Sequence, residues 1–557
     1  MNAVADQGSD ADRKNHIRAH EAMTRWRQLK QDRAQHERDW ADIARLIRPQ
    51  RGGFSLADPG SRTMEKALSS EPIQAASSFA SGIYSGLTNP ASTWFGFETP
   101  DPDLNAWQAM AEWNDIVTRR VFASFGPSLS SFYSSTFQAY ADIAAFGNAV
   151  AYDEFDPVER RFMDVTLSLA EVVFDVDAWG RVWEWVRRFS LTPRQAVARF
   201  GVAALPPSVR KAAEEGGQAD VWLYHHILPN ADWRSGRIGA KGKPVLSITI
   251  CEMDEWLVRE AGYEELPAYA PRWDVDTGQV CGTGPGFVAL PSARSVHQME
   301  AATLRAAQFA ADPTLLAPSR EDWPLSGTIR PGTVVYNGVN ARGDQMVRPL
   351  QIGGGIGLTV QEKASKVEEI KNAFHYSILT LQGRTGVTAE ESQIIEEARM
   401  REWAPHSDRI MEEYAARKVE RRFRELWRRG QLPPPPKEAA GVPLQVRYTS
   451  AAQLAKKARE GSEIMRFIQN LAPLAQISPR AIDRFDVDAA IEALHEASPN
   501  LPAKILRARD AADKLAEARA QQQQMAQMAQ MAQPLAGAMK DAAAAGQMMQ
   551  QDGGAAA

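Results

Sequence analysis

The residues best placed to contact a ligand stand in a short turn, Gln382-Gly383-Arg384-Thr385-Gly386, which Val387 follows. Gly383 and Gly386 can adopt positive φ angles, so the turn can present Arg384 at a sharp tip. A guanidinium in such a position is suited to contacting phosphate groups. The competing interpretation is a solvated arginine in an ordinary surface turn.

Two helices must position this turn. Apolar residues before it recur with a period close to 3.5 and predict one packed helix face: Val360, Ala364, Val367, Ile370, Phe374, Ile378 and Leu381. After the turn, Thr388 and Glu391 form a capping box that begins the next helix at once. A helix, a basic tip and a second helix make a unit suited to contacting a phosphate backbone.

Other candidate chemistry is weaker, and the sequence predicts no catalytic residue, no metal site and no cofactor. The stretch Gly239–Pro244 is the nearest approach to a phosphate-binding P-loop, but Pro244 stands where Ser or Thr should hold Mg²⁺. His225 and His226 are adjacent on a predicted strand and face opposite sides, so they cannot share a metal. Asp175 and Asp177 border a hairpin turn, where aspartate is common. Nothing in these patterns indicates an enzyme.

The composition is that of an ordinary soluble protein of several packed units. The chain has 557 residues, and 64 Lys and Arg against 69 Asp and Glu give a net charge of −5. A protein that grips DNA over a broad surface should be basic, so any nucleic acid is contacted locally or allowed to slide. Two cysteines indicate reduced thiols in a cytoplasmic product, and neither a signal sequence nor a membrane span is predicted.

The pattern along the chain predicts an α+β protein, mostly α-helical, with several domains. Helices are expected at 11–47, after Pro72, at 104–124, 130–145, 292–311 and 359–381, and from the capping box to Arg429. Strands are expected at 149–155, 220–228, 245–250, 255–260 and 444–448, with a hairpin at 172–186. Residues 451–510 should be helical, and 511–557 form an Ala-, Gln- and Met-rich tail that is either helical or disordered.

The order of these elements resembles the head-to-tail connector, or portal, protein of short-tailed (podovirus-type) bacteriophages. The strongest similarity is Arg384-Thr385-Gly386 followed by Val387-Thr388-Ala389-Glu390-Glu391. Further similar stretches are Asn89-Pro90 with Thr93-Trp94, Ala145-Phe146-Gly147-Asn148, Val172-Val173 with Asp177-Ala178-Trp179-Gly180, and the Gln- and Met-rich end. The resemblance covers most of the chain and is weakest at 312–358.

This resemblance implies a ring, typically a dodecamer, at one vertex of the capsid. Double-stranded DNA passes through its channel during packaging and ejection, and the subunit itself is no enzyme. It implies a wing (1–291 and 389–450), stem helices (292–311 and 359–381), a clip (312–358), a tunnel loop (382–388), a helical crown (451–510) and the tail (511–557). The Val360 to Leu381 stripe would pack the stem, and Gln382 to Val387 would face the DNA.

The implied partners are other copies of the chain, the terminase large subunit, tail adaptor proteins, major capsid and scaffolding proteins, and internal core proteins. No membrane is implied, and assembly would occur in the host bacterial cytoplasm before incorporation into the virion. Two alternatives remain at this point. One is a different capsid or scaffold component, and the other is a peripheral metal-dependent hydrolase such as a nuclease or peptidase.

Overall fold

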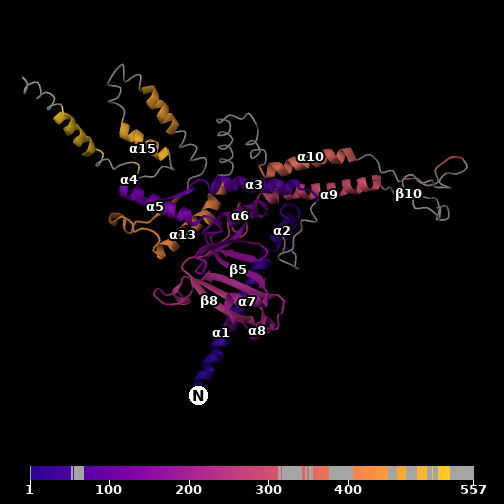
Figure 1. Ribbon diagram of the computed structural model, residues 1–557. Helices are drawn as coiled ribbons and strands as arrows, with labels where there is room; N and C mark the ends of the chain where they lie inside the picture. Colours follow the sequence, from indigo (N-terminus) through magenta and orange to yellow (C-terminus); the bar gives the residue numbers. More distant parts are fainter. Residues whose placement is uncertain are drawn as a thin grey trace, which may run out of the picture. The chain divides into compact units, whose positions relative to one another are not determined.

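The computed structural model confirms the α+β class (Figure 1). It describes residues 2–51, 54, 68–311, 315–316, 342–344, 348–349, 356–375, 405–448, 461–471, 486–497, 505, 512 and 514–526. The chain divides into two compact units. The first comprises Met1–Phe95, Arg120–Gln431 and Tyr448–Ala455, and the second comprises Gly96–Arg119, Leu432–Arg447 and Lys456–Ala557.

A five-stranded antiparallel sheet forms one part of the first unit. Its strands follow one another in chain order: β4 (Val172–Val176), β5 (Val182–Leu191), β6 (Val221–Pro229), β7 (Val245–Cys251) and β8 (Trp256–Tyr263). The predicted hairpin at 172–186 is therefore confirmed, with Val173 opposite Val186. Asp177 accepts hydrogen bonds from the backbone N–H groups of Trp179 and Arg181 and so shapes the turn.

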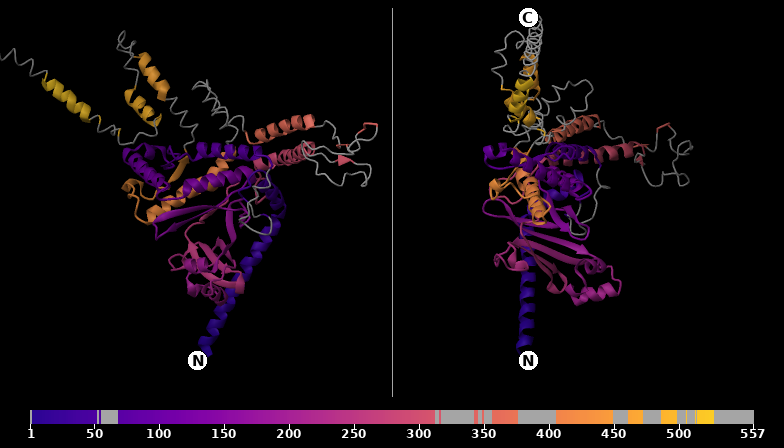
Figure 2. Two further views of the ribbon diagram at one scale, coloured as in Figure 1. Left: turned by 45° about the vertical axis from the view of Figure 1, so that its right-hand side comes forward. Right: turned by 60° about the vertical axis from the view of Figure 1, so that its left-hand side comes forward.

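Different helices pack against the two faces of this sheet. One face packs against α1 (Asn2–Asp32) through Ala22, Met23 and Trp26, which meet Val186 and Tyr224. The opposite face packs against α7 (Pro193–Phe200) and α8 (Pro207–Glu214). The period of two along each strand explains why neighbouring residues serve different faces. Figure 2 shows α1 in indigo running along the sheet.

The helix expected at 11–47 is wrong in one respect, because it breaks at Arg33. The backbone of Arg33 leaves the helical region (φ −96°, ψ 11°), and α2 (Ala34–Leu46) begins after it. The Arg33 guanidinium is buried and donates to the carbonyls of Leu169 and Val172. Pairing with these carbonyls next to the sheet compensates for burying the charge.

Helices and a small sheet make up the rest of the first unit. Helices α3 (Glu71–Leu87) and α6 (Phe132–Phe146) pack on each other, and α9 (Pro285–Ala311) packs on α2, α6 and α10 (Ile356–Ala373). Figure 1 shows α9 and α10 side by side. The three-stranded sheet has the order β3 (Arg161–Leu167), β2 (Val150–Asp156), β9 (Ala268–Tyr269).

Gly147 fixes the start of α9 against the end of α6. It takes a left-handed conformation (φ 68°) as the C-cap of α6, and a Cβ there would lie 2.3 Å from the carbonyl carbon of Thr283. Asn148 next to it exchanges two hydrogen bonds of 2.7 Å with the backbone of Gly282. Only glycine permits both the conformation and this close approach, so the chain enters α9 at a fixed place. Helix α9 accordingly begins at Pro285, ahead of the predicted Ser292.

Helix α10 ends earlier than the sequence predicts. Its last residue is Ala373 instead of Leu381, because His375 adopts a positive φ of 51° and turns the chain out of the helix. The chain is described again from 405 in a helix that contains a π segment, η6 (Met411–Ala416), and continues as α13 (Arg417–Arg428). The helix expected from the capping box lies outside the described residues up to 404.

The second unit contains shorter elements. Strands β1 (Phe95–Glu98) and β12 (Gln445–Tyr448) pair, and Arg447 and Glu98 form an ion pair of 3.2 Å across them. The helix expected at 104–124 is interrupted at Trp107, which is extended, giving α4 (Pro102–Ala106) and α5 (Gln108–Ser124); the unit boundary falls within α5. Of the helical region expected at 451–510, the structure describes helix at 461–471 and α15 (Val487–Ala497).

The remaining short elements connect the larger ones. They are η2 (Val202–Ala204), η3 (Ala240–Gly242), η4 (Met253–Glu255), η7 (Lys437–Ala439), β10 (Leu315–Leu316) and β11 (Arg348–Pro349).

Candidate functional site

Helix α10 packs on α9 and precedes the predicted DNA-facing turn, and its lysines are paired within the chain. Lys363 pairs with Glu300 of α9 at 2.7 Å, and Lys366 pairs with Glu369 at 2.7 Å. Lys371 lies 3.8 Å from Glu71 of α3 and 3.6 Å from Glu368. These three residues are all the lysines of α10. The helix therefore carries no lysine without a carboxylate partner among its described neighbours.

Polar contacts also fix the pair to the helices beside it. Arg294 of α9 pairs with Asp42 of α2 at 2.7 Å. The Ser292 hydroxyl donates to Glu369 of α10 at 2.6 Å. The hydrogen bond from Lys366, and after it the one from Ser292, lowers the pKa of Glu369. The Lys371 contact to Glu71 connects α10 to α3. The two helices are thus held at several points along their length.

The predicted packing stripe of α10 divides into two groups. Val367, Ile370 and Phe374 are buried, with Ile370 and Phe374 at 0% exposure. Val360 is 55% exposed and Ala364 is also exposed. Ile378 and Leu381 lie outside the described residues. A single chain therefore covers only the half of the stripe near the C-terminal end of α10.

The end of α10 packs into a cluster of aromatic rings. The ring of Phe79 from α3 contacts Phe374 at 6.1 Å, His375 at 5.9 Å and Trp273 at 5.3 Å. Trp273 in turn stacks on His406, with centroids 4.5 Å apart and an interplanar angle of 19°. The residues Phe79, Trp273, Phe374, His375 and His406 are called the loop-base cluster below.

The predicted tunnel-loop residues, Gln382, Gly383, Arg384, Thr385, Gly386 and Val387, lie outside the described residues. The structure describes the chain up to 375 and again from 405. Both of these ends contribute to the loop-base cluster, since Phe374 and His375 belong to one and His406 to the other.

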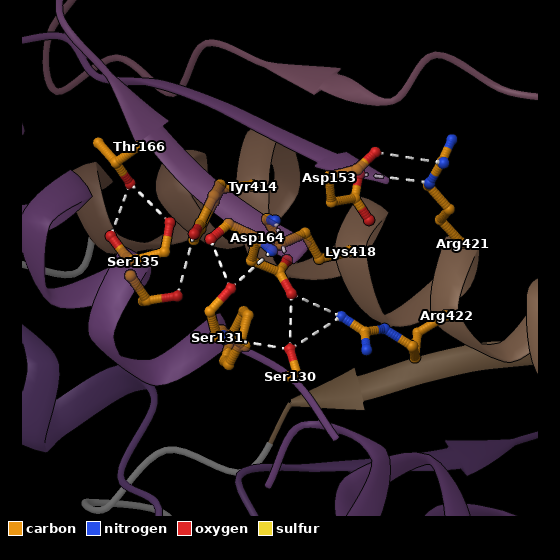
Figure 3. Close-up of polar contacts among 12 residues, drawn as sticks. Ser130, Ser131, Ser135, Asp153, Asp164, Thr166, Tyr414, Lys418, Arg421 and Arg422 are labelled. Carbon is orange, nitrogen blue, oxygen red and sulfur yellow. Dashed lines mark hydrogen bonds and ion pairs between the residues drawn. The ribbon is translucent and has the colours of Figure 1, made fainter. Parts of the chain in front are cut away.

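A buried charge cluster anchors the helix that follows (Figure 3). Asp164 of β3 contacts Lys418 Nζ at 2.5 Å and Arg422 Nη2 at 2.9 Å, and all three side chains are almost completely buried. The Ser130 hydroxyl donates to the same carboxylate at 2.6 Å. Burial works to raise the pKa of Asp164, but the charges of Lys418 and Arg422 outweigh it and hold the pKa well below its usual value.

Aromatic rings complete the surroundings of the two cations. The Arg422 guanidinium lies 3.5 Å from the centroid of Phe162, and Lys418 Nζ lies 4.7 Å from that of Tyr269. Nearby, Tyr414 of the π segment shares a 3.0 Å hydrogen bond with Thr136 of α6. Removing one member of such a cluster leaves a buried charge unpaired, so the cluster fixes α13 to the core.

Arg272 adds a second fixed point on the same helix. Its guanidinium contacts Glu413 at 2.5 Å, and its backbone N–H donates to the same carboxylate at 2.9 Å. It also donates to the carbonyl of Gly180 at 2.6 Å, in the hairpin turn between β4 and β5. Arg272 thereby joins the hairpin to the π segment.

The weaker chemical candidates of the sequence have structural roles. His226 bonds to Glu184 at 2.8 Å on the α1 face, while His225 bonds to Ser247 at 2.9 Å on the other side of β6. Burial lowers the pKa of His225 to about 3, so this ring stays neutral. Asp175 pairs with Arg25, and Asp177 shapes the hairpin turn. Residues 239–244 join β6 to β7 through η3.

The described residues contain neither a cluster of metal-ligand side chains nor a membrane-spanning helix. No three His, Cys, Asp or Glu side chains in this part of the chain gather as metal ligands would. Nor does any helix within it combine the length and apolar content needed to cross a bilayer.

Neither the loop-base cluster nor the buried charge cluster was predicted from the sequence. Trp273 follows Pro271-Arg272 in an irregular segment without periodicity, and Lys418 and Arg422 look like ordinary members of an Arg-rich helix. The one available signal is the spacing of four between Lys418 and Arg422, which places both on one helix face.

Comparison with known proteins gives the family. Residues 19–506 match the model of the bacteriophage head to tail connecting protein family. The portal protein of Salmonella phage epsilon15 is 29% identical over 512 residues, covering 89% of this chain and 90% of that protein. A probable portal protein of Bordetella phage BPP-1 is 27% identical over 477 residues, covering 84% and 85%.

A solved structure described as the virion of a native gene transfer agent particle aligns at a TM-score of 0.33 and 11% identity. It covers 77% of this chain and 89% of that chain. This similarity is too low to inform the fold. The family model, in contrast, spans most of the described elements, from α1 to the helical region after β12. The chain therefore belongs to the bacteriophage head-to-tail connecting protein family, whose members are structural components of the phage and not enzymes.

Proposed function

We propose that this protein is a portal: a ring, typically of twelve copies, at one capsid vertex through which double-stranded DNA is packaged and ejected. The observation that carries the proposal is the family match over residues 19–506, together with two relatives named portal protein or probable portal protein that align over more than four-fifths of their length. The arrangement of the paired helices supports it in two ways.

The first support is electrostatic. Every lysine of α10 has a carboxylate partner in its own chain, and the whole chain carries a net charge of −5. Each phosphate that a free cation neutralises adds salt-dependent affinity for DNA. A helix whose cations are already paired can therefore lie beside DNA without holding it, as a channel requires.

The second support is the apolar surface that one chain leaves uncovered. Val360 of α10 is 55% exposed, and Leu304 and Val288 of α9 are 52% and 70% exposed. In a head-to-tail ring the neighbouring copy would cover such residues, because each copy offers two different surfaces. We assign Val360 and Ala364 to packing between copies, and Val367, Ile370 and Phe374 to packing within one copy.

The proposed division of the chain follows the portal pattern. The wing would comprise 1–291 and 389–450, the clip 312–358, the crown 451–510 and the tail 511–557. The stem would comprise 292–311, which lies in α9, and 359–381, which begins in α10. Partners would be the terminase large subunit and later tail adaptor proteins at the clip, with capsid, scaffolding and internal core proteins around the wing and crown. The tunnel loop, 382–388, would bring Arg384 to the DNA phosphates.

Arg384→Ala tests the proposed DNA contact. Heads assembled with this variant should contain normal rings but lose packaged DNA or retain less of it, because a phosphate contact repeated around the channel is gone. DNA per head is measured by quantitative hybridisation and rings by electron microscopy. Arg194→Ala, at an exposed arginine of α7, is the matched control. Normally filled heads in the Arg384 variant would refute this role.

A further inference from the structure

The connection between β6 and β7, residues 230–244, is called the basic loop below. Its only carboxylate is that of Asp232, and its four cations are Arg234, Arg237, Lys241 and Lys243. The whole chain, in contrast, carries a net charge of −5. Lys243 pairs with Glu264, but the other three cations form no ion pair within the described part of the chain. The loop is therefore a local concentration of uncompensated positive charge.

Two large apolar side chains stand among these cations. Ile238 is 100% exposed and Trp233 is 51% exposed. A single exposed apolar residue needs no explanation, but here two of them lie in one loop with three unpaired cations. Tryptophan and arginine are also the residue types most enriched among the side chains that dominate binding energy in protein interfaces.

Backbone and amide hydrogen bonds hold the two arms of the basic loop together. The N–H of Asn230 donates to the carbonyl of Pro244 at 2.9 Å, and that of Arg234 donates to the carbonyl of Lys241 at 2.9 Å. The side-chain amide of Asn230 donates to the carbonyls of Ala240 and Lys243 at 2.9 and 2.8 Å. The pairing of 234 with 241 makes 235–240 the tip of the loop.

Glycines allow the tip to fold tightly. Gly236 and Gly239 have positive φ angles of 80° and 84°, which favour glycine. A Cβ on Gly242 would lie 1.7 Å from the carbonyl oxygen of Arg237, so only glycine permits this close approach. The Gly-rich stretch that distantly resembles a P-loop thus shapes a projecting tip that carries Arg237 and Ile238.

We propose that the basic loop is a docking site for a second protein whose contact surface presents carboxylates around an apolar pocket. The charges of Arg234, Arg237 and Lys241 call for an anionic partner, and Ile238 and Trp233 call for an apolar one. A phosphate backbone would pair with the cations but would leave Ile238 in water, so an acidic protein surface fits the whole set better. This inference goes beyond the proposed function, because it concerns neither the channel nor the helix pair.

The order of the loop favours such a role. Binding by a floppy segment costs conformational entropy, and a loop already held in one shape avoids most of that cost. The arms and the tip are fixed by the hydrogen bonds and glycines within the loop itself. Its side chains can therefore meet a partner without rearrangement of the sheet.

Site-specific photo-crosslinking tests the proposal on the full chain. Benzoylphenylalanine replaces Ile238 in protein supplied during phage infection, and the purified particles are illuminated. The expected product joins position 238 to a different polypeptide, and mass spectrometry should locate the joined residue in a segment rich in Asp and Glu. The same probe at Val158, which is 88% exposed in the turn between β2 and β3, should not give this product.

Reversing the charge of the loop should remove the product. The triple variant Arg234→Glu, Arg237→Glu, Lys241→Glu should lower the yield at position 238 by about tenfold or more, since like charges across an interface repel. Arg237→Glu alone serves if the triple variant fails to assemble. The matched control reverses three exposed cations elsewhere in the same unit and should keep the yield: Arg160→Glu, Arg194→Glu, Lys211→Glu.

Trp233→Ser tests the apolar half of the site. It leaves every charge of the loop in place, and it should still lower the yield severalfold if the ring enters a pocket of the partner.

Four results would overturn the proposal. They are the absence of any product at position 238, a product that joins two copies of this chain, a product that nuclease digests, and a yield that the charge reversals leave unchanged.

Discussion

The buried charge cluster and the paired helices both consist of ionic contacts, yet they differ in what surrounds them. Around Asp164, Lys418 and Arg422, every charge is buried and matched within one chain. On α10 the lysines are paired too, but these pairs are partly exposed and apolar residues such as Val360 stay uncovered.

This contrast indicates which part of the molecule is fully packed within a single copy. The charge cluster completes the core of the first unit and needs no partner. In the helix pair, the lysines of α10 are ion-paired, but some apolar side chains stay exposed. An element that assembles with identical neighbours requires such an exposed apolar surface. Stability should therefore depend on the cluster, and assembly on the helix pair.

Asp164→Asn should have the largest effect on stability. It leaves Lys418 and Arg422 buried without a counter-charge, and breaking such a pair costs about 3–5 kcal/mol. The midpoint of urea unfolding, followed by circular dichroism, measures the loss. Glu159→Gln, an exposed carboxylate in the turn between β2 and β3, is the control. A loss below about 1 kcal/mol would contradict the role assigned to the cluster.

Val360→Asp should affect assembly and leave the folded chain intact. A charge in an apolar contact between copies has no partner, whereas the same side chain is 55% exposed in the single chain. Size-exclusion chromatography with light scattering should therefore show smaller species with an unchanged circular dichroism spectrum. Val158→Asp, at a site that is 88% exposed in the turn between β2 and β3, should still assemble. Full-sized rings from the Val360 variant would place the interface elsewhere.

The prediction with the smallest effect concerns Glu300→Gln. It releases Lys363 from an ion pair whose side chains are 30% and 29% exposed, so the stability should fall by only about 0–1 kcal/mol. The freed lysine should steepen the salt dependence of DNA binding by up to about 0.9 per phosphate contacted. Glu260→Gln, which breaks the similarly exposed pair with Arg18, should leave the slope unchanged. If the salt dependence of DNA binding is unchanged in both variants, α10 does not lie beside the DNA.

The parts of this fold that could be predicted are those that depend on patterns of neighbouring residues. The hairpin at 172–186 follows from two β-rich runs around an Asp- and Gly-containing turn, and Gly147 marks the end of α6. The early end of α10 at Ala373 and the break at Arg33 were missed. Each depends on one residue's backbone conformation, and at Arg33 also on side-chain contacts with a distant segment.

Neither the loop-base cluster nor the buried charge cluster could be predicted, and the reason is the same for both. Lys418 and Asp164 are separated by 254 positions, and His406 and Trp273 by 133. A single sequence shows that these residues exist but not that the fold brings them together. The predicted tunnel loop, 382–388, lies outside the described residues and remains a prediction.

The central claim is that many copies of this chain surround a channel. Negative-stain electron microscopy of the purified full-length protein tests it most directly. The account predicts discrete annular particles of uniform diameter with a stain-filled central hole. Isolated globules or closed shells, with no annulus across the salt and protein concentrations examined, would contradict it.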